Sequence, residues 1–130
     1  MDSREERRDA SPPRVLVVED EVLTALDLQA CLERAGYRVV DLVFSGEDAV
    51  RRAAELKPDL VLMDITLKGD LGGIEAARLI QGNGGVSVIF LTAHTDQETL
   101  ARARESAPRA FITKPFVERD LLDKLAAVLA

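Results

Sequence analysis

Short hydrophobic runs alternate with longer amphipathic segments along the chain from residue 14 onward. The runs are rich in Val, Ile and Leu, which is typical of strands buried on both faces of a parallel sheet, and they cover residues 15–18, 37–44, 60–63, 86–91 and 110–113. Between them, apolar residues recur at helical spacings of three and four, which predicts helices over residues 21–35, 46–56, 74–80, 96–107 and 118–129.

Residues that typically start and stop helices support these bounds. Gly36 follows the first predicted helix, as expected of a residue that ends helices in a left-handed conformation. Ser45 with Asp48, and Thr95 with Glu98, have the spacing of N-terminal capping boxes, with Asp48 in place of the usual Glu.

The regular order of strand and helix predicts an α/β domain. Each helical crossover returns the chain to the same end of the sheet, so the strands run parallel, and right-handed crossovers place helices on both faces. We therefore expect a doubly wound five-stranded parallel sheet of the flavodoxin-like order 2-1-3-4-5 over residues 14–130. Residues 1–13 lack apolar periodicity and end in Ser-Pro-Pro, which predicts a disordered tail.

Composition narrows the classes of function. The chain has 130 residues, 47% hydrophobic and 31% charged, which fits one globular domain. Its net charge of −6 argues against binding to nucleic acid or anionic lipid. Cys31 is the single cysteine and His94 the single histidine, too few for an internal disulfide or a usual structural zinc site. The sequence shows neither a membrane span nor a secretory signal, so we expect a soluble, cytoplasmic protein.

Polar residues follow the predicted strands. In sheets of this kind ligands bind beyond the carboxyl ends of the strands. The first strand leads into Glu19-Asp20-Glu21, the third into Asp64, the fourth into Thr92-Ala93-His94 and the fifth into Thr113-Lys114-Pro115. Any one of these is ordinary where a strand meets solvent. Together they bring several carboxylates, a hydroxyl and an ammonium to one edge of the sheet.

Clustered carboxylates predict a bound cation, because two of them ~4 Å apart repel by about 4 kcal/mol at an effective dielectric of about 20. The candidate ligands are all oxygens, which favours Mg²⁺, an ion that takes few protein ligands and keeps water positions open for a phosphate. With the ion bound, Asp64 can act as a nucleophile toward phosphorus. Lys114 and Thr92 could then compensate the charge on the phosphoryl oxygens.

These strand ends resemble the receiver domain of two-component response regulators, the family that includes the single-domain chemotaxis regulator. The resemblance covers residues 14–129 and rests on four motifs in the family's order: VLVVEDE (15–21), DLVLMDI (59–65), FLTA (90–93) and AFITKPF (110–116). Each motif ends a predicted strand, and the four together are far more specific than any one alone.

The resemblance implies roles for the acids. Asp64 is similar to the phosphoacceptor, and Asp20 to the acid that binds magnesium directly, with Glu19 contributing directly or through water. The backbone carbonyl of Thr66 takes the place of the third protein ligand. Lys114 resembles the lysine that pairs with the phosphoryl group.

It also implies a switch. Thr92 resembles the hydroxyl that moves onto the phosphoryl group, where Ala93 would offer its amide, and Phe111 takes the place of the aromatic ring that turns inward with it. The Lys114–Pro115 peptide is usually cis in this family. The helix at 96–107, the strand with Phe111 and the last helix would then form the output face.

The sequence departs from the family pattern in two places. The family commonly has a proline four residues after the acceptor and a glycine eight after it, whereas Lys68 stands at the fourth position and Gly72-Gly73 at the eighth and ninth, as if one residue were inserted. Phe111 replaces the more frequent tyrosine.

Lone histidines are mostly exposed loop residues, but His94 lies two positions after Thr92, where its bulk could hinder the attacking water. We therefore predict that His94→Ala changes the acyl-phosphate lifetime.

The leading hypothesis is a receiver that takes a phosphoryl group from a histidine kinase or histidine phosphotransfer protein and then changes its affinity for an unidentified protein. We expect no enzymatic activity beyond its own phosphorylation and dephosphorylation. It would be a stand-alone regulator or a piece of a longer protein, and a homodimer is possible. The alternatives are a magnesium-dependent phosphatase of the aspartyl-phosphate type, a flavodoxin-like cofactor binder and a degenerate receiver. The phosphatase motif would need a second acid where Thr66 stands, and a flavodoxin would need a phosphate loop after the first strand.

Overall fold

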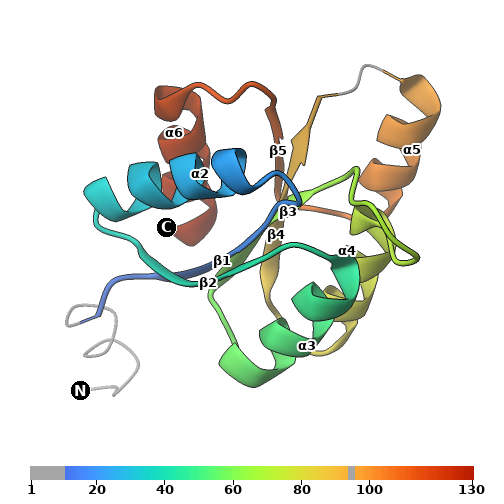
Figure 1. Ribbon diagram of the computed structural model, residues 1–130, viewed down its shortest axis with the longest axis horizontal. Helices are drawn as coiled ribbons and strands as arrows, with labels where there is room; N and C mark the ends of the chain where they lie inside the picture. Colours follow the sequence, from blue (N-terminus) through green and yellow to red (C-terminus); the bar gives the residue numbers. More distant parts are fainter. Residues whose placement is uncertain (1–10, 94–95) are drawn as a thin grey trace.

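A parallel five-stranded sheet forms the centre of the computed structural model, which describes residues 11–93 and 96–130 (Figure 1). Its strand order is β2-β1-β3-β4-β5, which confirms the predicted fold class and order. The strands are β1 (Arg14–Val18), β2 (Arg38–Val43), β3 (Leu60–Asp64), β4 (Ser87–Thr92) and β5 (Ala110–Thr113).

Helices cover both faces of the sheet (Figure 1). They are α2 (Val22–Arg34), α3 (Gly46–Leu56), α4 (Gly73–Gly82), α5 (Gln97–Glu105) and α6 (Glu118–Leu129). Apolar residues of α2 and α6 pack in one core cluster, and those of α3, α4 and α5 pack in the other.

The central strands supply both clusters by simple alternation. In β3, Leu60 and Leu62 point to the α2 side, whereas Val61 and Met63 point to the α3 side. Every residue of β3 is buried, because a strand with a sheet neighbour on each edge and helices on each face meets no water. This explains the solid apolar runs in the sequence and fixes which residue stands last in each strand.

Most element ends agree with the sequence predictions, and the differences have local causes. Gly36 has φ +95°, and Ser45 caps α3 by accepting a hydrogen bond from the Asp48 amide at 3.1 Å. Asp96 caps α5. Thr95, the predicted cap residue, lies outside the described residues.

Other element ends differ from their predicted positions as well. Helix α4 extends to Gly82 although glycines follow its predicted end, and α5 ends at Glu105, before its predicted end. Asp64 and Thr92 are the last residues of β3 and β4 instead of following them. The predicted tail falls mostly on residues 1–10, outside the described part of the chain, and stays a prediction.

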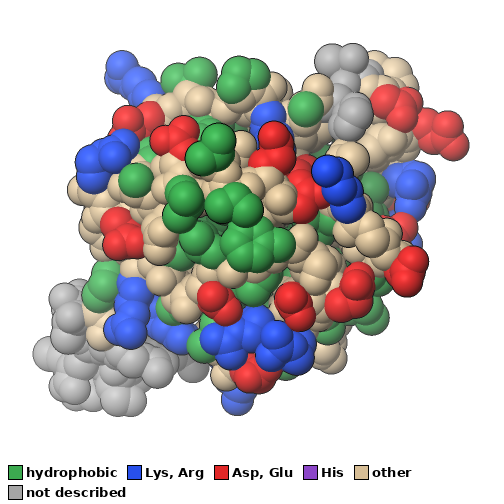
Figure 2. All heavy atoms as spheres, in the orientation of Figure 1, with side chains coloured by type: hydrophobic (Ala, Val, Ile, Leu, Met, Phe, Trp, Pro, Cys, Tyr) green, Lys and Arg blue, Asp and Glu red, His purple; other side chains and the backbone are tan. Residues whose placement is uncertain are grey.

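Hydrophobic side chains gather on the face that carries α2, shown in Figure 2. The exposed ones on this helix include Val22, Leu23 and Leu26, and Leu23 is 83% exposed. None of the helices in the described ranges has the length and apolar character needed to cross a lipid bilayer.

Candidate functional site

Four side chains from three strand ends meet at the carboxyl edge of the sheet. Oxygens of Glu19, Asp20 and Asp64 all lie within 4.8 Å of one another. Lys114 reaches the same point after β5, with its Nζ 2.8 Å from Glu19 Oε2 and 3.2 Å from Asp64 Oδ2. The structure therefore brings together the three acids and the lysine that the sequence predicted.

The parallel register explains this convergence. Asp64 closes β3 opposite Leu91, and Lys114 follows β5, whose last residue Thr113 lies opposite Thr92. The Lys114 amide donates a hydrogen bond to the Thr92 carbonyl at 2.8 Å, which continues the ladder one residue beyond the strand. Residues 50 positions apart in sequence thus reach the same place at the sheet edge.

Burial makes this site electrostatically unusual. Glu19 has no exposed surface and Asp64 is 4% exposed. Loss of hydration raises the pKa of Glu19 to about 7, which the nearby Lys114 ammonium only partly opposes. Burial also lowers the pKa of Lys114, but the carboxylates of Glu19 and Asp64 outweigh it, so this pKa is raised overall and the lysine stays cationic.

The Asp64 carboxylate is held in place by backbone groups. The Thr66 amide donates to Asp64 Oδ1 at 2.9 Å, so one oxygen is fixed by the turn after β3 while the other faces Lys114. A Cβ at Gly73, the first residue of α4, would overlap the Asp64 carbonyl oxygen. Only glycine allows α4 to begin this close to β3.

The two predicted switch residues lie on neighbouring strands. Thr92 is 5% exposed at the end of β4. Phe111 is half-buried in β5, and its ring centroid lies 5.9 Å from that of Phe90. The Lys114–Pro115 peptide is cis, as the resemblance implies. Phe111 therefore lies on the strand next to the one that carries Thr92.

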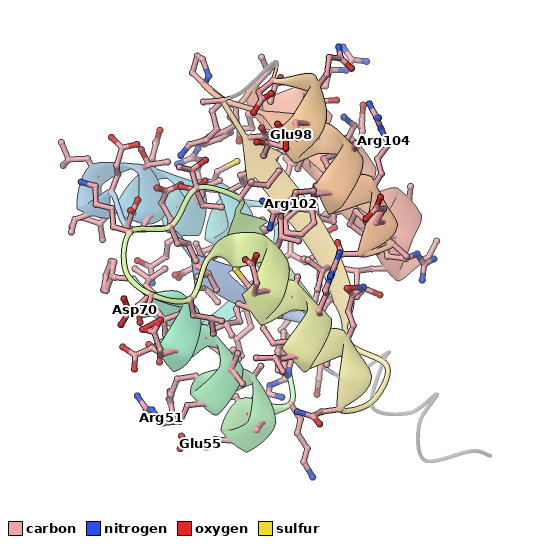
Figure 3. All side chains as sticks on the ribbon, turned by 90° about the vertical axis from the view of Figure 1, so that its right-hand side faces the viewer. Arg51, Glu55, Asp70, Glu98, Arg102 and Arg104 are labelled. Atoms are coloured by element: carbon pink, nitrogen blue, oxygen red, sulfur yellow. The ribbon has the colours of Figure 1, made fainter. Side chains whose placement is uncertain are left out.

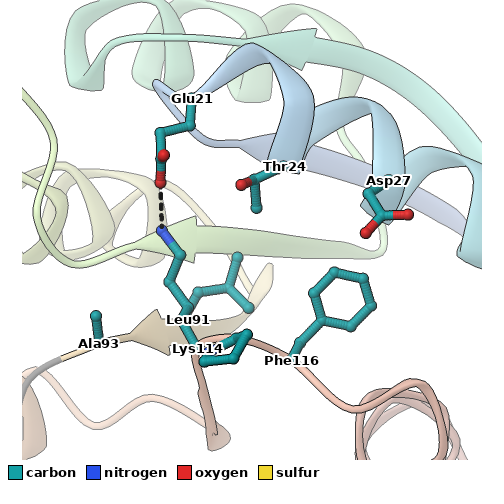
Figure 4. Close-up of a pocket in the computed structure, with 8 residues that line it drawn as sticks. Glu21, Thr24, Asp27, Leu91, Ala93, Lys114 and Phe116 are labelled. Carbon is teal, nitrogen blue, oxygen red and sulfur yellow. Dashed lines mark ion pairs between the residues drawn. The ribbon is translucent and has the colours of Figure 1, made fainter.

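A pocket opens beside the acids, between the start of α2 and the segment that follows β5 (Figure 4). It has a volume of about 340 Å³ and is lined mostly by apolar atoms of residues that include Leu91, Ala93 and Phe116. Glu21 stands at its rim, with Oε1 3.7 Å from Lys114 Nζ. The sequence motif contained Glu21, but the predicted site residues did not, although three consecutive acids after β1 were the available signal.

The predicted roles of three site residues stay predictions. His94 lies outside the described residues, so its predicted effect on the acyl-phosphate lifetime stays a prediction. Ala93 is exposed at the pocket. The predicted roles of the Ala93 amide and the Thr66 carbonyl likewise stay predictions.

The donor set fits a hard divalent cation. The side chains of this cluster offer only carboxylate oxygens, which suit magnesium better than a thiophilic metal. Glu19 Oε2 is fully buried and, within the described residues, accepts no hydrogen bond of good geometry despite its charge contact with Lys114. A buried carboxylate oxygen with such an incomplete set of partners is expected where a cation binds.

Comparisons with known proteins identify the family. The family model of the response regulator receiver domain matches residues 15–126, and the chain belongs to this family. The chain is 38% identical over 113 residues to the transcriptional regulatory protein PdtaR of Mycobacterium tuberculosis, which covers 87% of the chain and 55% of PdtaR. The DNA-binding response regulator MtrA of the same species is 34% identical over 121 residues, or 93% of the chain and 52% of MtrA. The chain thus spans about half the length of these relatives.

Solved receiver domains share the fold. The signal receiver domain of a modulated diguanylate cyclase from Desulfovibrio desulfuricans G20 superposes with a TM-score of 0.87 at 37% identity, covering 92% of this chain and 94% of that one. The receiver domain of the sensor histidine kinase PA1611 from Pseudomonas aeruginosa PAO1 gives 0.83 at 31% identity, covering 92% and 98%. That domain has a magnesium ion coordinated in its active-site cleft. This chain is a receiver domain of two-component signal transduction.

Proposed function

We propose that Asp64 accepts a phosphoryl group from the phosphohistidine of a histidine kinase or histidine phosphotransfer protein. The observation that carries this proposal is the buried Asp64 with a lysine ammonium 3.2 Å from Oδ2 and further acids within 4.8 Å. A carboxylate oxygen attacks phosphorus, the new O–P bond forms as the N–P bond breaks, and the histidine nitrogen leaves with the electron pair. The product is an acyl phosphate on Asp64.

Glu19, Asp20 and Asp64 would hold Mg²⁺ in this proposal, with the Thr66 carbonyl as a further ligand. The ion supplies charge compensation for the phosphoryl oxygens. The Lys114 Nζ forms ion pairs with Glu19 and Asp64. After phosphorylation it would leave Asp64 Oδ2 and pair with an oxygen of the phosphoryl group. Thr92 would donate its hydroxyl to another oxygen.

Phosphorylation would change partner binding through the face formed by α5, β5 and α6. A phosphoryl group adds roughly −1.5 to −2 charge at pH 7. Movement of Thr92 toward it would leave space for the half-buried Phe111 ring to turn inward. The protein would therefore act by binding an unidentified target and not by turnover of a separate substrate, and we place it in the cytoplasm. Exposed Leu23 and Leu26 of α2 would contribute to contact with the phosphoryl donor.

The test is incubation with magnesium and a small acyl phosphate, followed by intact mass. We expect the gain of one phosphoryl group, lost on chelation and in Asp64→Asn. The matched control is Asp70→Asn, an exposed acid in the loop after β3, which should be phosphorylated like the parent. Phosphorylation that persists in Asp64→Asn would refute the assigned acceptor. Rapid turnover of unrelated phosphate esters would instead favour the phosphatase.

A further inference from the structure

The loop between β3 and α4, residues 65–72, connects the acidic site to the first turn of α3. It carries the residue that the sequence has beyond the usual family spacing. Figure 3 shows it extending over one end of α3, with Asp70 beside that end and Arg51 and Glu55 further along the helix. Two of its residues make hydrogen bonds to side chains outside the loop: Lys68 to Asp20, and Leu71 to Glu47.

The Lys68 end touches the proposed metal site directly. The Lys68 amide donates a hydrogen bond to Asp20 Oδ2 at 3.1 Å. A carboxylate has two oxygens, so this bond fixes the rotation of the group and leaves the second oxygen available to a cation. The orientation of Asp20 therefore depends on a backbone amide 48 positions away in sequence.

The Leu71 end is held by α3. The Leu71 amide donates to Glu47 Oε1 at 3.1 Å. The Leu71 carbonyl lies so close to Gly46 that a Cβ there would overlap it, and the Leu71 side chain packs against the α3-side core. Among these contacts, the hydrogen bond to Glu47 is the polar one. None of the proposed metal ligands lies on α3.

We propose that Glu47 is a positioning residue for the acidic site: its carboxylate holds the loop so that the Lys68 amide fixes Asp20 for cation binding. This inference rests on the proposed magnesium-dependent function. It goes beyond it by assigning a role to a residue that touches neither the metal ligands nor the phosphoryl group.

The test compares Glu47→Ala, Glu47→Gln and Asp48→Ala. Asp48 is the matched control, because it is the neighbouring exposed acid of the same helix turn and its side chain pairs with Arg51, not with the loop. Magnesium affinity is measured by calorimetry on the unphosphorylated protein. Amide hydrogen exchange of Lys68 and Leu71 is measured by NMR without metal.

In Glu47→Ala we expect magnesium to bind about threefold to fivefold more weakly, the loss expected for one hydrogen bond, and both amides to exchange about fivefold faster. Glu47→Gln keeps an oxygen acceptor and should stay within about twofold of the parent. Asp48→Ala should do so too, which separates positioning from charge.

Equal magnesium affinities in Glu47→Ala and Asp48→Ala would overturn the proposal, as would a Glu47→Gln variant as weak as Glu47→Ala. Unchanged exchange of the Lys68 amide would overturn it as well. A parent protein that binds no magnesium would refute the proposed function instead, while the exchange measurement would still decide whether Glu47 holds the loop.

Discussion

Glu19 should make the metal-free protein less stable at alkaline pH. Its carboxyl has no exposed surface, and burial raises its pKa from 4.5 to about 7. The folded state therefore holds this proton more tightly than the unfolded state. For an acid with a raised pKa, stability is fully present below the unfolded value and is lost as the pH rises through the folded value.

The difference between 4.5 and about 7 corresponds to about 3 kcal/mol at full ionisation. Linkage places most of this loss, about 2–3 kcal/mol, between about pH 5 and pH 8. The Glu19→Gln variant lacks the ionising group, so its free energy of unfolding should fall by that much less over the same interval. Titrating groups that do not contact Glu19 contribute equally to parent and variant and cancel in the comparison, and Lys114, whose pKa is raised, stays charged in the parent over this interval.

The assay is urea unfolding of both proteins with a chelator at the two pH values. Glu33→Gln, which changes an exposed acid of α2, is the control and should follow the parent. Millimolar magnesium should reduce the loss of stability of the parent between pH 5 and pH 8, because a dication stabilises the ionised acid. If Glu19→Gln and the parent lose stability in parallel from pH 5 to pH 8, the buried-charge reasoning is refuted.

Three further predictions concern packing and burial. Gly73→Ala should lower the free energy of unfolding in urea by about 1–3 kcal/mol, because its Cβ would overlap the Asp64 carbonyl. Gly82→Ala at the open end of the same helix should not, and equal effects of the two substitutions would contradict the role of the close approach. Lys114→Met should lower the free energy of unfolding by about 3 kcal/mol near neutral pH. The same substitution should cost less in a Glu19→Gln background, and equal costs in the two backgrounds would argue against the buried pair. The Cys31 thiol, with its pKa raised to about 11 by burial, should resist alkylation at about pH 8 until urea unfolds the chain, and rapid labelling of the folded protein would contradict its burial.

The fold was predictable because its core follows a simple rule. Strands buried on both faces need apolar residues at every position, so 60–63 and 86–91 stand out in the sequence, and topology then places the residues that follow them at one edge. Asp64 and Lys114 were found in this way, without knowledge of any distance. The cap of α5 was harder to place because two good capping residues are adjacent, and Asp96 accepts hydrogen bonds from the Glu98 amide and the Thr99 hydroxyl.

The contacts of the β3–α4 loop were not predictable. The bond from Lys68 to Asp20 depends on a loop whose path includes Gly69 at φ +110°, and no periodic pattern encodes that path. The same holds for Glu47, which is an ordinary first-turn acid by sequence and contacts the loop only through tertiary structure. Sequence order identified the groups at strand ends, whereas the groups that orient them come from irregular backbone.

The register that joins Asp64 to Lys114 also sets when the site is complete during synthesis. On the ribosome Asp64 emerges 50 residues before Lys114, a delay of roughly 3–10 seconds at about 5–20 residues per second. Until β5 is added beside β4, a nascent chain has the proposed nucleophile without the ammonium that lies beside it. If Asp64 is the acceptor, as proposed, incomplete copies would compete poorly for the phosphoryl donor.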